Sequence, residues 1–328
     1  MMTIQGEVDN YYEQLGIDKR NPSFSWKITG MELESEYTAY RLMIAKSMEQ
    51  LIWEEYLYDT GKVESKDHIG IQYSGEALDS VTKYCWKVVV WTSSSANKDS
   101  KEETRMDKKL ESQVFSFVTG RLEEDASIGT WIMNGTAKPF YARKEWEISH
   151  EIKEAYALVS GLGQFYMRIN GEKVSDHEFD PGWTYYDRKI QYVQYDIKEY
   201  LKKGNNAIGI EVGNGWYISE TEERYYHSMP PKNPMYSFIP PNLNPYVPFS
   251  DCLALCGAFY IIYEDDTREI LETNSEWMVR ESATKLANVY GSEIYDAREY
   301  PAGWDRVNYE GRDWKKATPI DKDRRPKG

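Results

Sequence analysis

Residues 162–174 have the sequence Leu-Gly-Gln-Phe-Tyr-Met-Arg-Ile-Asn-Gly-Glu-Lys-Val, the strongest local indication of fold in the chain. Residues 164–169 and 172–174 flank Asn170-Gly171, the dipeptide that best tolerates a positive φ angle at both central positions of a turn. We therefore predict a β-hairpin with a type I′ turn. In the preceding segment, residues 155–160, successive side chains fall on opposite faces, as in a strand.

Further strands are predicted on both sides of this hairpin. Residues 140–148 and 207–212 fit strands, and residues 258–263 and 268–272 fit a second hairpin. Residues 196–201 fit one helical turn, ended by Gly204 and the two asparagines after it. The segment 230–250 is rich in proline and aromatic residues, which is typical of an irregular insertion.

The first third of the chain predicts a separate β-sandwich. Candidate strands cover residues 23–28, 39–45, 84–92 and 113–118, separated by turn-forming residues. The polar segment 93–109 is interpreted as a surface loop. An acidic, turn-rich stretch at 120–129 marks the boundary to the second module.

Composition supports two folded domains and excludes several function classes. The 328 residues include 41% hydrophobic and 14% aromatic residues, enough for two cores. A net charge of −14 argues against nucleic-acid binding. No apolar run approaches the roughly 18 residues of a membrane span, and the polar residues 1–10 do not resemble a signal peptide, so we expect no membrane partner and a cytoplasmic location.

The cysteines and the common catalytic motifs give no site. Cys85 lies in an apolar run and is expected in the core, while Cys252 and Cys256 lack the second ligand pair of a zinc site. No G-x-S-x-G, P-loop or H-E-x-x-H motif is present. The 54 acidic residues are too many for sequence to select a glycosidase acid/base pair.

An acidic segment and two aromatic clusters are the remaining candidates. Asp176, Glu178 and Asp180 would share one face of an extended chain and offer oxygen ligands to calcium, although a solvated surface is the favoured interpretation. We expect no required cofactor, with calcium as the only candidate ion. The carbohydrate-binding candidates combine aromatic rings with hydrogen-bonding side chains: Asp180, Trp183, Tyr185, Asn214 and Trp216. For each ring, the alternative is a core or loop-anchoring role.

The chain resembles bacterial α-L-rhamnosidases of glycoside hydrolase family 78. Motifs that resemble their N-terminal domain occur at residues 162–174, 180–186, 192, 195–197, 204–207, 213–217, 295–298 and 303–304. Motifs that resemble the preceding fibronectin-III-like module occur at residues 22–26, 39–41, 59–63 and 84–88. The order and spacing of these motifs cover nearly the whole chain.

The resemblance implies an all-β fold, a fibronectin-III or immunoglobulin-like sandwich followed by a jelly-roll-type β-sandwich. We predict the first over residues 1–122 and the second over 123–320, with an insertion at 220–257. Residues 321–328 would begin a linker to the catalytic (α/α) barrel that follows in this family and hydrolyses terminal α-L-rhamnosides with inversion. Such a mechanism needs two carboxyl groups about 6.5–9.5 Å apart, and no such site is placed in this segment.

Three functions follow as hypotheses. The first is a non-catalytic accessory region that supports the C-terminal catalytic barrel, which predicts an exposed apolar patch. The second is binding of rhamnose-containing carbohydrate, as part of an enzyme or as a stand-alone protein, with an affinity near about 1 mM. The third, hydrolysis at an unrecognised site, is the least favoured, so we expect this segment to be inactive alone.

Overall fold

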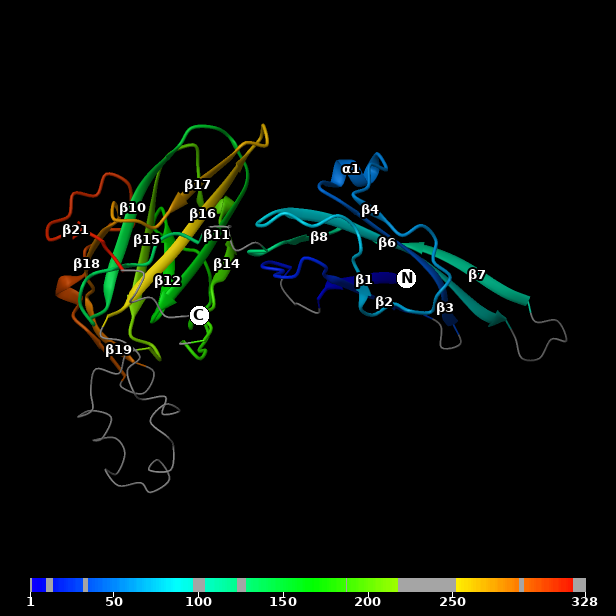
Figure 1. Cartoon of the computed structure of the whole chain (residues 1–328), viewed down its shortest axis with the longest axis horizontal. Coiled ribbons are helices and arrows are strands. Elements are labelled where there is room, and N and C mark those ends of the chain that lie inside the picture. Colours follow the sequence, from blue (N-terminus) through cyan, green and yellow to red (C-terminus); the bar gives the residue numbers. More distant parts are fainter. Residues whose placement is uncertain are drawn as a thin grey trace, which may run out of the picture. The chain divides into compact units, whose positions relative to one another are not determined.

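The computed structural model describes residues 2–9, 14–31, 35–96, 104–122, 128–186, 188–217, 252–288 and 292–320. Contacts divide the chain into two compact units, Met1–Ala126 and Ser127–Gly328. Strands dominate both units, so the predicted all-β fold is confirmed (Figure 1). In the part of the chain that the structure describes, no helix has the length and apolar character needed to cross a membrane.

The first unit contains two antiparallel sheets. In one, the strand order is β1-β2-β5; in the other it is β4-β3-β6-β7, with β8 also paired to β6. The bounds are β1 Thr3–Val8, β2 Ser23–Thr29, β3 Ser35–Ala45, β4 Tyr58–Asp59, β5 Ile71–Gln72, β6 Lys83–Ala96, β7 Thr104–Glu111 and β8 Phe115–Val118. The helix α1, Met48–Ile52, is capped by Ser47, whose hydroxyl accepts from the Gln50 amide at 3.2 Å.

Large aromatic side chains fill the core between these sheets. Phe24 of β2 packs edge to face against Trp86 of β6, with ring centroids 5.0 Å apart, and against Phe117 of β8 at 5.7 Å. All three side chains are essentially inaccessible to solvent. The predicted strands 23–28, 84–92 and 113–118 therefore supply these three rings, and Cys85 is buried as expected.

The predicted surface loop at residues 93–109 is wrong at both ends. Strand β6 continues to Ala96 and β7 begins at Thr104, in a register that pairs Ser93 with Asp107 and Ala96 with Thr104. A two-stranded ladder is held by backbone hydrogen bonds, which polar residues form as readily as apolar ones. The low apolar content of this segment therefore did not prevent strand pairing.

The second unit is a sandwich of two six-stranded, antiparallel sheets. The first sheet has the order β13-β12-β15-β10-β18-β21; the second has β14-β11-β16-β9-β22, with β17 paired to β16. The bounds are β9 Ile132–Met133, β10 Phe140–Ile148, β11 Ile152–Leu162, β12 Gln164–Ile169, β13 Glu172–Lys173, β14 Val193–Asp196, β15 Gly204–Gly213, β16 Ala254–Tyr263, β17 Arg268–Glu272, β18 Met278–Glu281, β21 Lys315–Lys316 and β22 Thr318–Pro319. Figure 1 shows β10, β15 and β18 on one side of the unit and β11, β16 and β17 on the other.

Both predicted hairpins of this unit are confirmed. Asn170 and Gly171 have φ angles of 52° and 90° and connect β12 to β13. Strands β16 and β17 pair from Ala258↔Glu272 to Ile262↔Arg268. The predicted helical turn is a 3-10 helix at Lys198–Tyr200.

The predicted insertion, residues 220–257, is only partly described. Residues 218–251 lie outside the described residues, as do 321–328. Strand β16 begins at Ala254, inside the predicted insertion, because the apolar run that fills the core starts at Leu253. This strand is buried along nearly its whole length, which explains why its sequence does not alternate.

The outer face of the first sheet is covered by a segment that follows β18. This cover segment, residues 292–306, contains β20 (Ser292–Tyr295) and a 3-10 helix at Ala297–Glu299; β20 pairs with β19 (Thr284–Asn288). The Trp304 ring lies against Gly209 of β15, where a Cβ atom would be 2.6 Å from the ring. Arg143 donates to the Trp304 carbonyl at 2.8 Å, and Arg168 pairs with Asp305 at 2.6 Å. The middle of this sheet, around Tyr141 and Gly209, is therefore buried on both sides.

The short strands β21 and β22 extend different sheets. Lys315 and Lys316 pair with β18 in the first sheet, whereas Thr318 and Pro319 pair with β9 in the second. Between them, the buried Ala317 donates its amide to the Trp277 carbonyl at 2.8 Å.

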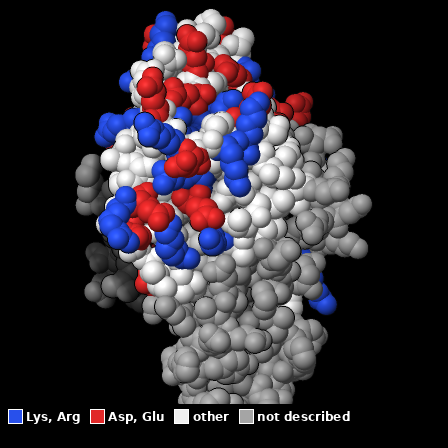
Figure 2. All heavy atoms as spheres, turned by 90° about the vertical axis from the view of Figure 1, so that its left-hand side faces the viewer, with Lys and Arg blue, Asp and Glu red and all other residues white. Residues whose placement is uncertain are grey.

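Charges of both signs are interleaved on the surface. Figure 2 shows acidic and basic side chains side by side on the face that it presents, without a field of one sign. Ion pairs of the second unit include Lys138–Glu281, Lys144–Glu276 and Lys285–Glu299. Although the net charge is −14, part of the acidic surface is neutralised locally by such pairs.

Candidate carbohydrate-binding site

The loop after β13 is fixed at Asp180, which ends the acidic segment and forms a cis peptide bond with Pro181. The Asp180 carbonyl accepts a hydrogen bond from the Phe165 amide at 2.7 Å. Its carboxylate contacts His177 Nδ1 at 3.0 Å and accepts a short hydrogen bond from the Tyr195 hydroxyl. Burial, reinforced by the Asp180 carboxylate, raises the pKa of Tyr195, so this phenol stays protonated and donates to Asp180. The loop is thereby attached to strands of both sheets, β12 and β14.

The loop after β15 is fixed by Asn214, whose side chain is fully buried. The Asn214 amide group donates to the Ala137 carbonyl at 3.3 Å and accepts from the Ala287 amide at 3.1 Å. Gly215 donates to the Ala287 carbonyl at 2.8 Å and has a φ angle of 54°. A Cβ atom at Gly215 would lie 2.6 Å from the Gln164 side chain, so glycine is required both by backbone conformation and by space.

Two aromatic pairs join these loops. Tyr186 and Tyr217 pack edge to face with centroids 5.1 Å apart and are almost fully buried. Trp183 and Trp216 stack with centroids 5.7 Å apart and an interplanar angle of 27°. Trp183 is 49% exposed, and Trp216 is partly buried against the core. We call Trp183 and Trp216 the aromatic platform.

The aromatic platform has the chemistry of a surface that binds apolar ring faces. An exposed indole ring supplies a flat surface for the C–H groups of a sugar, and its position is set by the ring stacked on it. The second tryptophan is in turn attached to the core, so little conformational freedom is lost when a ligand binds.

The other predicted site residues have different surroundings. Tyr185 is 41% exposed, and its carbonyl accepts from the Arg188 and Lys189 amides at 2.8 Å in a turn. Asn214 and Asp180 hold the two loops through the hydrogen bonds given above. The two aromatic motifs selected from the sequence included Tyr186 and Tyr217, which the structure places in the alternative, loop-anchoring role. The sequence did not select Tyr195 as a residue that supports the site.

The three carboxylates proposed as calcium ligands are not brought together. Glu178 pairs with Lys173 at 2.9 Å, Asp180 faces His177 and Tyr195, and Asp176 is exposed. Among residues 2–320, wherever the structure describes them, no three His, Cys, Asp or Glu side chains are arranged to hold a metal ion.

Comparison with known families identifies the second unit. Residues 150–326 match the model of the α-L-rhamnosidase N-terminal domain. The chain belongs to this family. Residues 4–107 match the N-terminal immunoglobulin domain of Rha78A-like proteins, in agreement with the immunoglobulin-like sandwich of the first unit. The α-L-rhamnosidase N-terminal domain thus contributes both loops of the aromatic platform.

Curated relatives extend the similarity to nearly the whole chain. An α-L-rhamnosidase of Formosa agariphila is 27% identical over 327 residues, covering 92% of this chain and 32% of the relative. An α-L-rhamnosidase of Alteromonas sp. is 24% identical over 315 residues, covering 93% of this chain and 32% of the relative. This chain therefore spans about a third of the length of these α-L-rhamnosidases.

Solved structures share the fold. The α-L-rhamnosidase of Dictyoglumus thermophilum superposes with a TM-score of 0.79 at 27% identity, covering 99% of this chain and 34% of that chain. The α-L-rhamnosidase of Aspergillus terreus superposes with a TM-score of 0.78 at 21% identity, covering 98% of this chain and 34% of that chain.

Proposed function

We propose that this chain is a non-catalytic accessory region of an α-L-rhamnosidase that binds rhamnose-containing carbohydrate on the aromatic platform. The observation that carries the proposal is the exposed Trp183 ring stacked on Trp216. L-Rhamnose is a 6-deoxy sugar, so its methyl group and ring C–H groups form an apolar face that suits an indole. The activity named for the relatives, which act as α-L-rhamnosidases, supports this choice of sugar.

Weak binding is expected from such a platform. Each ring contributes about 0.5–1.5 kcal/mol beyond burial, by analogy with aromatic pairs. A platform with few direct hydrogen bonds should bind with a dissociation constant near about 1 mM, which corresponds to roughly 4 kcal/mol. Weak individual sites are useful in an enzyme on polymeric substrates, because attachment at one site raises the local concentration at another.

Calorimetric titration of the purified chain with L-rhamnose tests the proposal. We expect saturable binding that Trp183→Ala and Trp216→Ala each weaken about two- to ten-fold. Tyr300→Ala removes another exposed ring, 42% accessible, and should leave the affinity unchanged. Absence of heat up to about 50 mM L-rhamnose would reject the binding role.

Hydrolysis of p-nitrophenyl α-L-rhamnoside separates the accessory role from catalysis. We expect no turnover by this chain, since no pair of carboxyl groups suited to glycoside hydrolysis was identified from its sequence. Turnover that survives the platform substitutions would place an active site within these residues and overturn the accessory role.

A supporting role toward a catalytic domain has separate evidence. Met48 and Ile52 of α1 and Trp53, which follows it, are 50%, 66% and 68% exposed, and exposed apolar side chains of this kind are typical of docking surfaces. The catalytic barrel of an α-L-rhamnosidase is the proposed occupant. Hydrogen exchange of residues 47–56 should slow when this chain is joined to such a barrel, and unchanged exchange would argue against docking at α1.

A further inference from the structure

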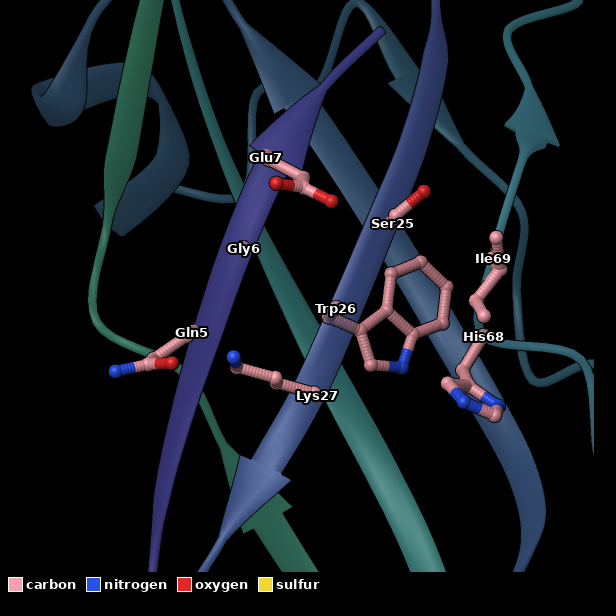
Figure 3. A pocket seen from close by; sticks show the side chains of 8 residues that line it. All are labelled: Gln5, Gly6, Glu7, Ser25, Trp26, Lys27, His68 and Ile69. Carbon is pink, nitrogen blue, oxygen red and sulfur yellow. The ribbon is translucent and has the colours of Figure 1, made fainter. Parts of the chain in front are cut away.

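The immunoglobulin-like unit carries a pocket of about 260 Å³ that is separate from the aromatic platform. Figure 3 shows Gln5 and Glu7 extending from β1, Lys27 from β2, and Ile69 on the segment at the other side of β2. Strands β1 and β2 pair in a register that places Gln5 beside Lys27. The pocket is thus built on regular strands, which hold its walls in fixed positions.

Two polar side chains of the lining are used by the fold, since the Ser25 hydroxyl accepts from the Gly70 amide at 3.0 Å and His68 Nδ1 contacts the Lys66 carbonyl at 3.1 Å, whereas three others are not. Among the described residues, the Gln5 amide, the Glu7 carboxylate and the Lys27 ammonium group have neither a hydrogen bond nor an ion pair. Other exposed charges of the same unit form ion pairs, as in Lys46–Asp79 at 3.0 Å. One carboxylate and one ammonium group leave the pocket formally neutral, so it does not select an ion of either sign.

Apolar surface completes the pocket. The Ile69 side chain is 70% exposed, which is unusual for a large aliphatic residue. The Trp26 side chain is on the other face of this sheet, because it is paired with Gly6 and packs in the core against Tyr40, with ring centroids 5.2 Å apart. It therefore lies behind the pocket.

We propose that this pocket binds a single unit of a neutral saccharide, which gives the chain a second carbohydrate site on its first unit. A sugar hydroxyl both donates and accepts, so it pairs equally well with a carboxylate, an ammonium group and an amide. The C–H face of the same sugar covers Ile69. The pocket is near the lower limit of ligand-site volumes, which fits one ring rather than a long oligosaccharide.

Nuclear magnetic resonance of the full chain carrying Trp216→Ala tests this site with the aromatic platform disabled. The probes are L-rhamnose, D-galactose, D-glucose and D-xylose, each added to about 100 mM, and the reporter is the indole N–H signal of Trp26. We expect at least one sugar to move this signal saturably. Because hydrogen bonds to charged groups are lost, Glu7→Gln with Lys27→Met should weaken that binding at least about ten-fold.

The control is Glu55→Gln, which removes an exposed carboxylate of the same unit outside the pocket and should leave the affinity unchanged. A Trp26 signal that none of the four sugars moves would overturn the proposal, as would sugar binding that is unaffected by the double substitution. Tighter binding of a short neutral peptide than of any sugar would also overturn it, in favour of a peptide site. These outcomes do not depend on whether L-rhamnose binds to the aromatic platform. Failure of one proposal can therefore be distinguished from failure of the other.

Discussion

The hydrogen bond between Tyr195 and Asp180 should be a major source of stability in the second unit. The Tyr195 side chain is 7% exposed and the Asp180 carboxylate 16%, so solvent competes little for either partner. A hydrogen bond to a charged group contributes about 1.5–3 kcal/mol to the free energy of unfolding. Asp180→Ala also leaves the Tyr195 hydroxyl and His177 Nδ1 without this acceptor, so we expect a loss of about 3–5 kcal/mol.

A double-mutant cycle isolates the contact. The free energy of unfolding would be measured in urea for the original chain, Asp180→Asn, Tyr195→Phe and the double variant, following tryptophan fluorescence. We expect a coupling energy of about 1–3 kcal/mol. Transitions of the first unit are untouched by these substitutions and serve as an internal reference.

Asp176→Asn is the matched control, because it changes an exposed carboxylate of the same loop and should alter stability by less than about 0.5 kcal/mol. A coupling energy below about 0.5 kcal/mol would refute the argument, because it would show that the two groups do not stabilise each other in solution.

Three further variants or conditions test other parts of the second unit. Glu211→Ala removes the buried acceptor of the Tyr166 hydroxyl and should lower the urea midpoint, with a loss of about 2–4 kcal/mol in the free energy of unfolding. Glu211→Gln keeps an acceptor oxygen and should lower the free energy of unfolding by less. Gly163→Ala should lower the thermal midpoint, because φ is 121° and a Cβ atom would lie 2.3 Å from the Gly213 carbonyl oxygen. Burial, with a smaller effect of a neighbouring tyrosine, raises the pKa of Tyr186 to about 12. The phenol of the unfolded chain ionises near pH 10, so this contribution to the free energy of unfolding should be fully present below about pH 10 and be lost as the pH rises toward 12. Urea midpoints measured at each pH should therefore fall over this range, and should fall less steeply for Tyr186→Phe than for the original chain.

Local signals predicted the fold best where one short segment determines the backbone. Asn170-Gly171 specifies its turn through backbone conformation alone, so the hairpin could be placed from sequence. Residues 140–148 likewise coincide with β10. The ribbon of β6 and β7 could not be predicted, because pairing of polar strands depends on a partner rather than on the pattern within either one.

The candidate site likewise combines features that short sequence motifs predicted with contacts that they could not predict. Trp183 and Trp216 were selected as separate aromatic motifs, but their stacking depends on two loops whose positions are set by Tyr195 and Ala287. These contacts join residues far apart in sequence. Composition also gave no indication that Ile69 would be exposed beside Glu7 and Lys27, since apolar residues usually predict burial.

The arrangement of β21 and β22 has a mechanical consequence. Residues 315–316 and 318–319 join opposite layers of the sandwich, so tension applied to the chain at Ile320 would act first on the second sheet, through β22, and then on the first sheet, through β21. The Ile320 amide, which donates to the Trp131 carbonyl at 2.8 Å, and the buried Ala317 lie directly on this load path. A strand attached to a single sheet could be peeled away from that sheet alone, whereas detaching these residues requires breaking contacts with both sheets. This short segment therefore ties the two layers of the sandwich together.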